Sequence, residues 1–283
     1  MADAAIATAS NLAQRLADGA RFAVLTGAGC STGSGIPDYR DDDGEWKHAR
    51  PVMFQDFVNE HNVRQRYWAR SMLGWPRMTQ AKPGKAHQAL ATLQTGGAVE
   101  RLITQNVDGL HQQAGSADVI DLHGRLDEVR CLSCQTVTTR KAWQGRISVL
   151  NPQWQDTVHD VRDAPDGDAI IEQADYSSFH VPECPQCGGI VKPEVVFFGE
   201  NVPRQRVDDA YAAVDAADGV IVAGSSLMVF SGFRFARRCH EQDKPLYIVN
   251  RGKTRADDIA SEKLHGDVGE ILQALADSVA PLK

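Results

Sequence analysis

The sequence has little of what marks a membrane or secreted protein. No run in its 283 residues approaches the ~20 apolar residues that a membrane-spanning helix needs. The first 20 residues carry Asp3, Asp18 and a single arginine but no long apolar core, so they do not resemble a targeting peptide. Their apolar spacing predicts an amphipathic helix that ends near Gly19. We therefore expect a cytoplasmic protein with no membrane partner.

An excess of positive charge is also missing. The chain has 30 Lys and Arg against 37 Asp and Glu, which gives a formal net charge of −7. A general nucleic-acid-binding protein needs a basic footprint, so we expect no nucleic-acid partner. The apolar share of 42% and charged share of 24% are typical of a globular protein, and the length suffices for one large domain or two modest ones.

Cysteines are few, but four of the six form two Cys-x-x-Cys pairs, Cys131 with Cys134 and Cys184 with Cys187. Two such pairs can direct four thiolates at one tetrahedral Zn²⁺, which leaves no open coordination position. The pairs therefore predict one structural zinc ion. The gap of 49 residues (135–183) is longer than usual for such a site. The alternatives are a redox dithiol and four unrelated core cysteines.

Apolar runs at 22–26, 101–104, 219–224 and 246–250 alternate with helical patterns, which predicts buried parallel strands. We expect an α/β fold with a doubly wound, Rossmann-type parallel sheet. Two regions interrupt the alternation. The first, 40–82, is predicted to be a helical excursion, and the second, 126–192, an inserted small zinc-binding domain. Residues 1–125 and 193–283 would then form the nucleotide-binding domain.

A glycine-rich stretch, VLTGAGCSTGSGIPDYR, follows the first predicted strand. Gly27-Ala28-Gly29 could let backbone N–H groups approach a pyrophosphate, although the next glycine is Gly33, not at the standard dinucleotide spacing. An ordinary glycine-rich turn is the alternative. Polar residues at the ends of two further strands, Gly224-Ser225-Ser226 and Asn250, favour a nucleotide site.

The stretch TQNVDGLH (104–111) follows another strand and offers Gln105, Asn106 and Asp108 on one short loop. Such groups suit a carboxamide and ribose hydroxyls, but a polar turn is an equally common reason for them. His123 ends the apolar run of IDLHGRL (120–126) and could act as a general base. A lone histidine is more often structural, and both interpretations stay open on these residues alone.

These motifs, together with KPEVVFFGE (192–200) and GSSL (224–227), occur in the order found in sirtuins, and the match covers about 20–275. RQRYWARSMLGWP (64–76) is similar to the class II branch, which contains the mitochondrial sirtuin-4 proteins. The resemblance implies an NAD-dependent protein-lysine deacylase, which transfers the acyl group to ADP-ribose and releases nicotinamide. Its partners would be acylated lysine side chains, and NAD its co-substrate.

The resemblance also implies roles for individual residues. His123 would be the general base, with Asn106 and Asp108 in the catalytic set. Val196, Phe197, Phe198, Gly199 and Glu200 would pair with the substrate backbone by strand addition. The cofactor contacts would come from Gly27, Ala28, Gly29, Ile36, Pro37, Asp38, Tyr39, Arg40, Gln105, Asn106, Asp108, Gly224, Ser225, Ser226, Asn250, Arg251, Gly252 and Val268.

Tyr67 and Arg70 have the Tyr-x-x-Arg spacing of sirtuins that select acidic acyl groups, and on a helix they would share a face. The pair leads to the hypothesis of a glutaryl-like or hydroxymethylglutaryl-like acyl preference. The alternative is a packed tyrosine and a surface arginine. Among competing functions, a mono-ADP-ribosyltransferase, a zinc-containing dehydrogenase and a non-enzymatic NAD sensor stay open. Arg251 leaves room for NADP, but we expect NAD.

Overall fold

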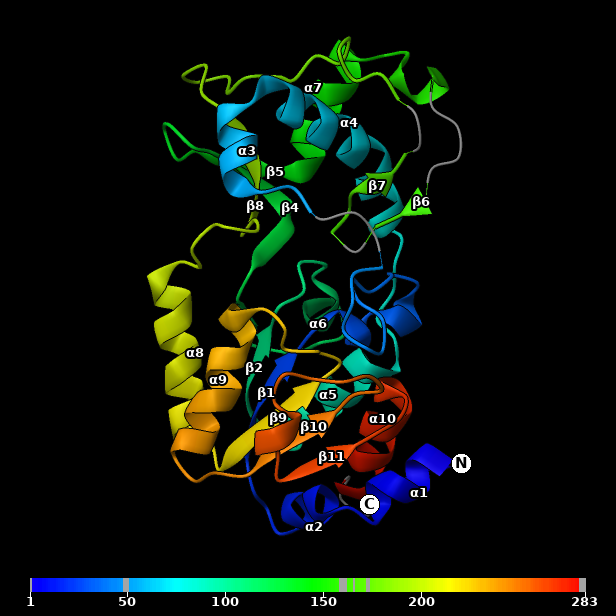
Figure 1. Cartoon of the computed structure of the whole chain (residues 1–283), viewed down its shortest axis with the longest axis vertical. Coiled ribbons are helices and arrows are strands. Elements are labelled where there is room, and N and C mark those ends of the chain that lie inside the picture. The colour runs from blue at the N-terminus through cyan, green and yellow to red at the C-terminus, as the bar shows by residue number, and fades with distance from the viewer. Residues whose placement is uncertain (1, 48–50, 158–161, 165, 172–173, 280–283) are drawn as a thin grey trace.

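A computed structural model describes residues 2–47, 51–157, 162–164, 166–171 and 174–279. Six parallel strands form its large sheet in the order β11-β10-β9-β1-β2-β3 (Figure 1). They are β1 (Phe22–Thr26), β2 (Val99–Thr104), β3 (Ile120–Asp121), β9 (Gly219–Ala223), β10 (Leu246–Val249) and β11 (Glu262–Leu264). This is the doubly wound order of dinucleotide-binding folds, and the predicted fold class is confirmed.

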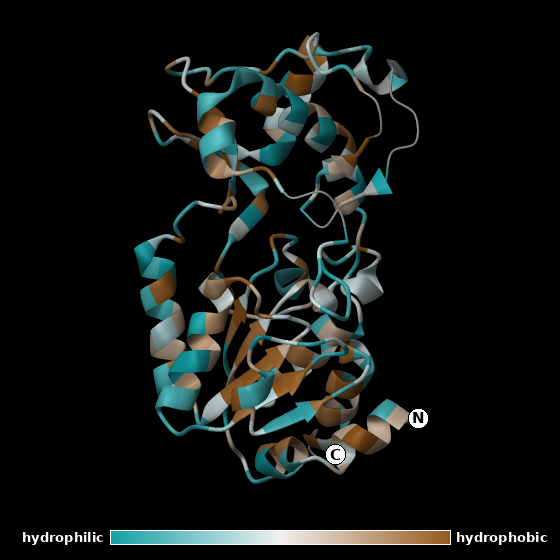
Figure 2. Cartoon of the chain, viewed as in Figure 1, coloured by the Kyte–Doolittle hydropathy of each residue, from teal (hydrophilic) through white to brown (hydrophobic). Residues whose placement is uncertain are grey.

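Helices cover both faces of this sheet because its strands are apolar on both sides. Along β1, Phe22 and Val24 face one core while Ala23 and Leu25 face the other. The first core takes α1 (Ala2–Thr8), α2 (Asn11–Ala17), α5 (Lys85–Thr95) and α10 (Val268–Val279), and the second takes α8 (Arg204–Ala216) and α9 (Phe230–Glu241). Figure 2 shows the inner strands of the sheet as the most apolar part of the ribbon, whereas the edge strand β11 is hydrophilic.

The N-terminal segment forms two short helices where the sequence predicts one. Ser10 separates them: its hydroxyl donates to the Ala7 carbonyl and accepts from the Ala13 N–H, which caps α2. None of the helices in the described part of the chain combines the length and apolar character that spanning a membrane requires.

A smaller module lies at the other end of the molecule (Figure 1). Its antiparallel sheet joins β5 (Val137–Thr139), β4 (Gly124–Cys131) and β8 (Val191–Val195). The remaining elements are α3 (Phe54–Asn59), α4 (His61–Met78), α7 (Arg140–Leu150), η3 (Trp154–Thr157) and the hairpin of β6 (Arg162–Asp163) and β7 (Ala169–Ile170). Trp68, Trp143 and Val129 share one core, so α3 and α4 of the 40–82 excursion pack with the module, whereas the Asp42 carbonyl accepts from the Lys253 N–H in the loop after β10.

Candidate functional site

A cavity of about 1100 Å³ opens at the carboxyl ends of the parallel strands, between the large sheet and the module. It lies over β1 and its neighbour β9, where the strand order reverses, which is where doubly wound sheets bind ligands. Its walls come from the loops after β1, β2, β9 and β10 and from the segment after β8. Its volume exceeds that of most small-ligand pockets, so it has room for a dinucleotide.

The first glycines of the loop let two chain segments meet. The N–H of Gly27 donates to the Ala223 carbonyl at 3.1 Å and the N–H of Gly29 to that of Gly224 at 2.8 Å. A Cβ on Gly27 would lie 2.7 Å from the Cβ of Ser225, and one on Gly29 would lie 2.8 Å from the Cα of Gly224. These glycines therefore allow the close approach of the loops after β1 and β9.

The loop does not turn directly into an α-helix. It forms two short 3₁₀ turns, η1 (Ala28–Cys30) and η2 (Thr32–Ser34), and ends at Gly35 with φ +83°. The chain then runs along the cavity wall. There Asp38 pairs with Lys47 at 2.5 Å, and the Arg40 guanidinium lies 4.0 Å above the Trp46 ring. The segment 36–40 is thus held by partners that are close to it in the sequence.

The loop after β2 is tied to the loop after β1 by side chains. Asn106 Nδ2 donates to the Gly27 carbonyl and to the Ser31 hydroxyl, both at 3.0 Å. Ser31 in turn donates to Asp108 Oδ2 at 2.7 Å. Gln105 Nε2 donates to the Ser225 hydroxyl at 2.7 Å, which brings in the loop after β9. Three loops are therefore joined through one polar network.

Two buried histidines lie behind this network. The rings of His87 and His111 are 4.7 Å apart, and His111 Nε2 lies 2.9 Å from the Thr26 hydroxyl. His87 Nδ1 accepts from the Gly84 N–H, and its Nε2 lies 3.4 Å from the Ser31 hydroxyl. Burial lowers the pKa of both, that of His111 to about 3, so they are neutral at physiological pH.

His123 lines the cavity at the start of β4 and makes two hydrogen bonds. Its Nδ1 lies 3.0 Å from the Gln105 carbonyl, which can only accept, so Nδ1 carries the proton. Its Nε2 therefore has the lone pair and accepts from the Ser231 hydroxyl at 2.9 Å. Burial, followed by the charges of Arg206 and Arg234, lowers the pKa of His123 to about 4. The ring is a neutral base with Nε2 as its accepting atom.

The remaining residues expected at the cofactor line the same cavity: Ser226, Asn250, Arg251, Gly252 and Val268. Arg251 pairs with Asp267 at 3.3 Å, and Asn250 Nδ2 donates to the Gly252 carbonyl at 2.9 Å. Arg251 already has an acidic partner, which disfavours its use for a 2′-phosphate.

The segment after β8 connects the cavity to the module. The Val196 N–H donates to the His123 carbonyl at 2.7 Å, and the Phe197 N–H donates to Glu200 Oε2 at 2.9 Å. The Phe198 carbonyl accepts from the Phe54 N–H at 2.9 Å. Several backbone groups expected to pair with a substrate therefore have partners within the chain.

The predicted acyl pocket has a different charge from that expected. Tyr67 lines the cavity among the rings of Phe57 and Phe197, whereas Arg70 is not among the lining residues. Arg70 Nη2 pairs with Asp168 at 2.9 Å, and its Nε donates to the Ala169 carbonyl at 2.5 Å. The structure therefore does not support a free guanidinium for an acidic acyl group, because the 162–170 hairpin already uses it.

Asp166 and Asp168 of that hairpin line the cavity instead. Burial raises the pKa of both carboxyls, and Arg70 opposes this effect. Gly74 of α4 lets the hairpin lie close, since a Cβ there would collide with the Asp168 carbonyl group. Pro165, which directly precedes Asp166, lies outside the described residues. Carboxyl groups thus dominate this end of the cavity.

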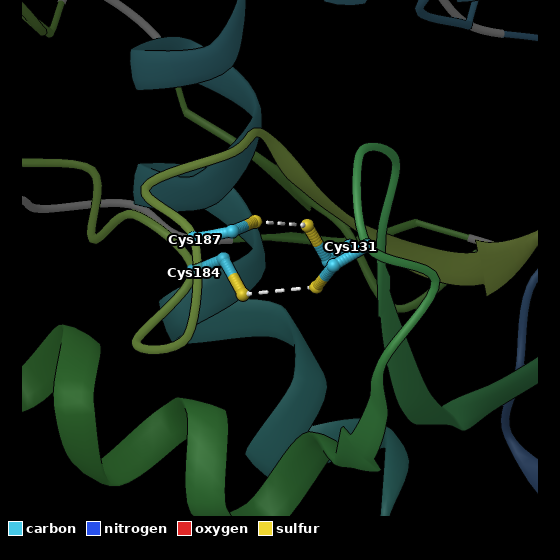
Figure 3. Close-up of side chains that lie close together, drawn as sticks. Cys131, Cys184 and Cys187 are labelled. Atoms are coloured by element: carbon cyan, nitrogen blue, oxygen red, sulfur yellow. Dashed lines mark hydrogen bonds between the residues drawn. The ribbon is translucent and has the colours of Figure 1, made fainter.

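The four paired cysteines come together within the module (Figure 3). All four Sγ atoms lie within 4.8 Å of one another, with Cys131 to Cys187 at 3.5 Å and Cys134 to Cys184 at 3.7 Å. Zn–S bonds of about 2.3 Å in a tetrahedron require S–S separations of about 3.8 Å. The cysteines are therefore positioned to bind a structural zinc ion, as predicted.

Comparison with known proteins decides the family. The model of the Sir2 family matches residues 27–231. The chain belongs to the Sir2 family. An NAD-dependent protein deacetylase of Bordetella bronchiseptica is 54% identical over 252 residues, which cover 89% of this chain and 91% of that protein. NAD-dependent protein deacetylase 2 of Bradyrhizobium diazoefficiens is 55% identical over 244 residues, 86% and 89% of the two chains.

A solved structure of Sir2 with a p53 peptide and NAD⁺ is similar to this Sir2 protein throughout. The TM-score is 0.73 at 33% identity, over 93% of this chain and 95% of that one. The likeness extends over both the large sheet and the module, so the cavity between them belongs to the shared fold.

Several residues of this Sir2 site could not be recognised from the sequence. Ser31 stands inside the quoted glycine-rich motif, but its bonds to Asn106 and Asp108 depend on a loop distant in sequence. Ser231 has no motif that would connect it to His123. Asp166 and Asp168 belong to the inserted 126–192 region, and only the fold brings them to the cavity.

Proposed function

We propose that this Sir2 protein is an NAD-dependent protein-lysine deacylase that transfers the acyl group to ADP-ribose and releases nicotinamide. The single observation that carries the proposal is His123 Nε2, an accepting nitrogen in the wall of a dinucleotide-sized cavity. The names of the Bordetella and Bradyrhizobium relatives and the NAD⁺ and peptide in the solved relative support it.

When bound, NAD supplies a ribose–nicotinamide bond whose cleavage makes the ribose an acceptor for the acyl group. The chain would contribute binding groups and a proton acceptor. Ile36 and Asp108 would hold the carboxamide, while the loops after β9 and β10 would hold the adenosine half. His123 Nε2 would take the proton of a ribose hydroxyl, since the ring is neutral above about pH 4.

For the acyl group, the cavity favours a neutral occupant. Asp166 and Asp168 line that end, and the Arg70 guanidinium is engaged by Asp168. A glutaryl carboxylate would bring a further acid next to these two buried carboxyls, which is costly in a low dielectric. We therefore expect acetyl-lysine to be preferred over glutaryl-lysine, contrary to the hypothesis from the Tyr67 and Arg70 spacing.

The branch within the family is inferred from sequence alone. RQRYWARSMLGWP (64–76) supports a class II, sirtuin-4-like assignment. In the structure these residues belong to α4, whose Tyr67 and Trp68 pack in the module core. A class II member would be expected to remove larger neutral acyl groups as well as acetyl, so the substrate panel below also bears on the branch.

The decisive experiment measures nicotinamide release and O-acyl-ADP-ribose with acetyl-, butyryl- and glutaryl-lysine peptides. Wild type should turn over acetyl-lysine, with acyl product equal to nicotinamide, and His123→Ala should not. ADP-ribosylated protein without free acyl product would instead indicate a mono-ADP-ribosyltransferase. NAD binding without any nicotinamide release from wild type would indicate a sensor and overturn the proposal.

A further inference from the structure

Three arginine guanidinium groups lie around an exposed aromatic ring at the start of α9. We call Phe230, Arg234, Arg237 and Arg255 the α9 surface. Phe230 is 44% exposed, and three guanidinium carbons lie over its ring at 5.2, 5.3 and 5.9 Å. Arg255 also lies 4.4 Å above the Phe233 ring.

Two of these arginines have no acidic partner among the described residues. Arg237 pairs with Glu241 at 3.3 Å, whereas Arg234 and Arg255 make no ion pair in the described part of the chain. The Nε of Arg234 is buried and has no hydrogen-bond partner there. By contrast, Arg238 on the same helix binds Asp215 at 2.9 and 3.0 Å. In a chain of net charge −7, this local positive excess is unusual.

The surface borders the reaction site. Val229, which directly precedes Phe230, lines the cavity, and Ser231, which follows it, donates to His123 Nε2. The Arg234 charge is near enough to lower the pKa of His123. A lysine side chain that reaches His123 must enter from the surrounding protein surface. The residues that flank such a lysine would therefore lie across neighbouring surfaces, including this one.

We propose that the α9 surface binds an Asp or Glu side chain close in sequence to the acyl-lysine of a protein substrate. The inference rests on the proposed deacylase function and adds the sequence context of its substrates. Guanidinium groups bind carboxylates through paired N–H donors, and the Phe230 ring gives the aliphatic part of the acidic residue an apolar contact. Selection would act on binding, because the carboxylate would not touch the reacting atoms.

The test compares two acetyl-lysine peptides that differ only in flanking residues, acidic in one and their amides in the other. For wild type we expect a KM about 5-fold lower for the acidic peptide at low salt, with equal kcat, and a smaller difference at high salt. Arg255→Gln, which does not contact His123, should remove most of this KM difference, and Arg234→Gln should act in the same direction. Arg238→Gln is the matched control, since its guanidinium is already bound to Asp215.

Equal KM values for the two peptides, with measurable turnover, would overturn the proposed role of the α9 surface and leave the deacylase proposal intact. An equal effect of Arg238→Gln and Arg255→Gln would also overturn it, because general charge would then explain the preference. No nicotinamide release from any acylated peptide would instead overturn the proposed function itself.

Discussion

The two ends of the cavity are built in different ways. At the proposed cofactor end, Gly27 and Gln105 follow directly after parallel strands, Ser225 comes two residues after the end of β9, and hydrogen bonds between loops join them. At the acyl end, Tyr67 and Asp168 come from a helix and a distant hairpin, and an ion pair with Arg70 orients the hairpin. The first end depends on strand order, and the second on how the module packs.

The cofactor end would therefore determine which reaction takes place, whereas the acyl end would determine which acyl group is accepted. Strand ends converge in every doubly wound sheet, so the cofactor end is a consequence of the fold. The acyl end depends on one guanidinium, two carboxyls and the glycine at 74 that admits them. We therefore expect substitutions at the cofactor end to affect all substrates equally. At the acyl end, we expect loss of a carboxyl that lines the cavity to change selection, and loss of Arg70, which does not line it, to change stability.

The largest expected effect is at the cofactor end. His123→Ala removes the accepting Nε2 and should lower kcat for acyl transfer by about 10³-fold with every acyl group. His240→Ala, an exposed histidine on α9, is the control and should leave kcat unchanged. Product formation by quenched-flow separates the two variants. A loss of kcat with only one acyl group would contradict the assignment of His123 to an end of the cavity that serves all substrates equally.

Loss of the metal should have the second-largest effect. Cys131→Ser removes one of four thiolates, and we expect zinc content to fall from one ion per chain to nearly none, with the module destabilised by several kcal/mol. Elemental analysis and thermal unfolding measure this. Cys239 is buried in the core between the large sheet and α9, away from the four paired cysteines. The Cys239→Ser protein should therefore retain one zinc ion per chain. A zinc-free Cys131→Ser protein with unchanged melting would show that the metal does not hold the module.

Arg70→Ala tests the acyl end directly. The change leaves Asp168 without its cation, which should lower the free energy of unfolding by about 1–3 kcal/mol and reduce acetyl and glutaryl turnover in similar proportion. Arg204→Ala, an exposed arginine on α8, serves as the control. Collapse of glutaryl turnover with acetyl turnover preserved would restore Arg70 as the receptor of an acidic acyl group.

The smallest expected effect concerns Ser231. Its O–H donates to the neutral form of His123, so Ser231→Ala should raise the pKa of that imidazole from about 4. The acid limb of kcat should move to higher pH by about half a unit, while Arg206 and Arg234 still oppose protonation. Ser231→Thr keeps the hydroxyl and should restore the wild-type limb. Identical pH profiles for all three proteins would show that the serine does not act through His123.

Local patterns were sufficient wherever neighbours in sequence are neighbours in space. The apolar runs of β1, β9 and β10 predicted buried parallel strands, and the spacing within each Cys-x-x-Cys pair predicted a metal site. The Tyr67 and Arg70 spacing was read in the same way, but it says nothing of Asp168, 98 positions beyond Arg70, which takes the guanidinium.

The sequence by itself determined the parallel sheet, the residues at its strand ends and the four sulfur ligands, because strand and ligand geometry repeat over a few residues. Only the tertiary structure decided that α3 and α4 share the core of the module, that Ser231 reaches His123, and that carboxyls line the proposed acyl end. Each of these features depends on contacts between residues far apart in the chain. Packing and charge neutralisation determine which residues meet there, and a local sequence pattern does not contain that information.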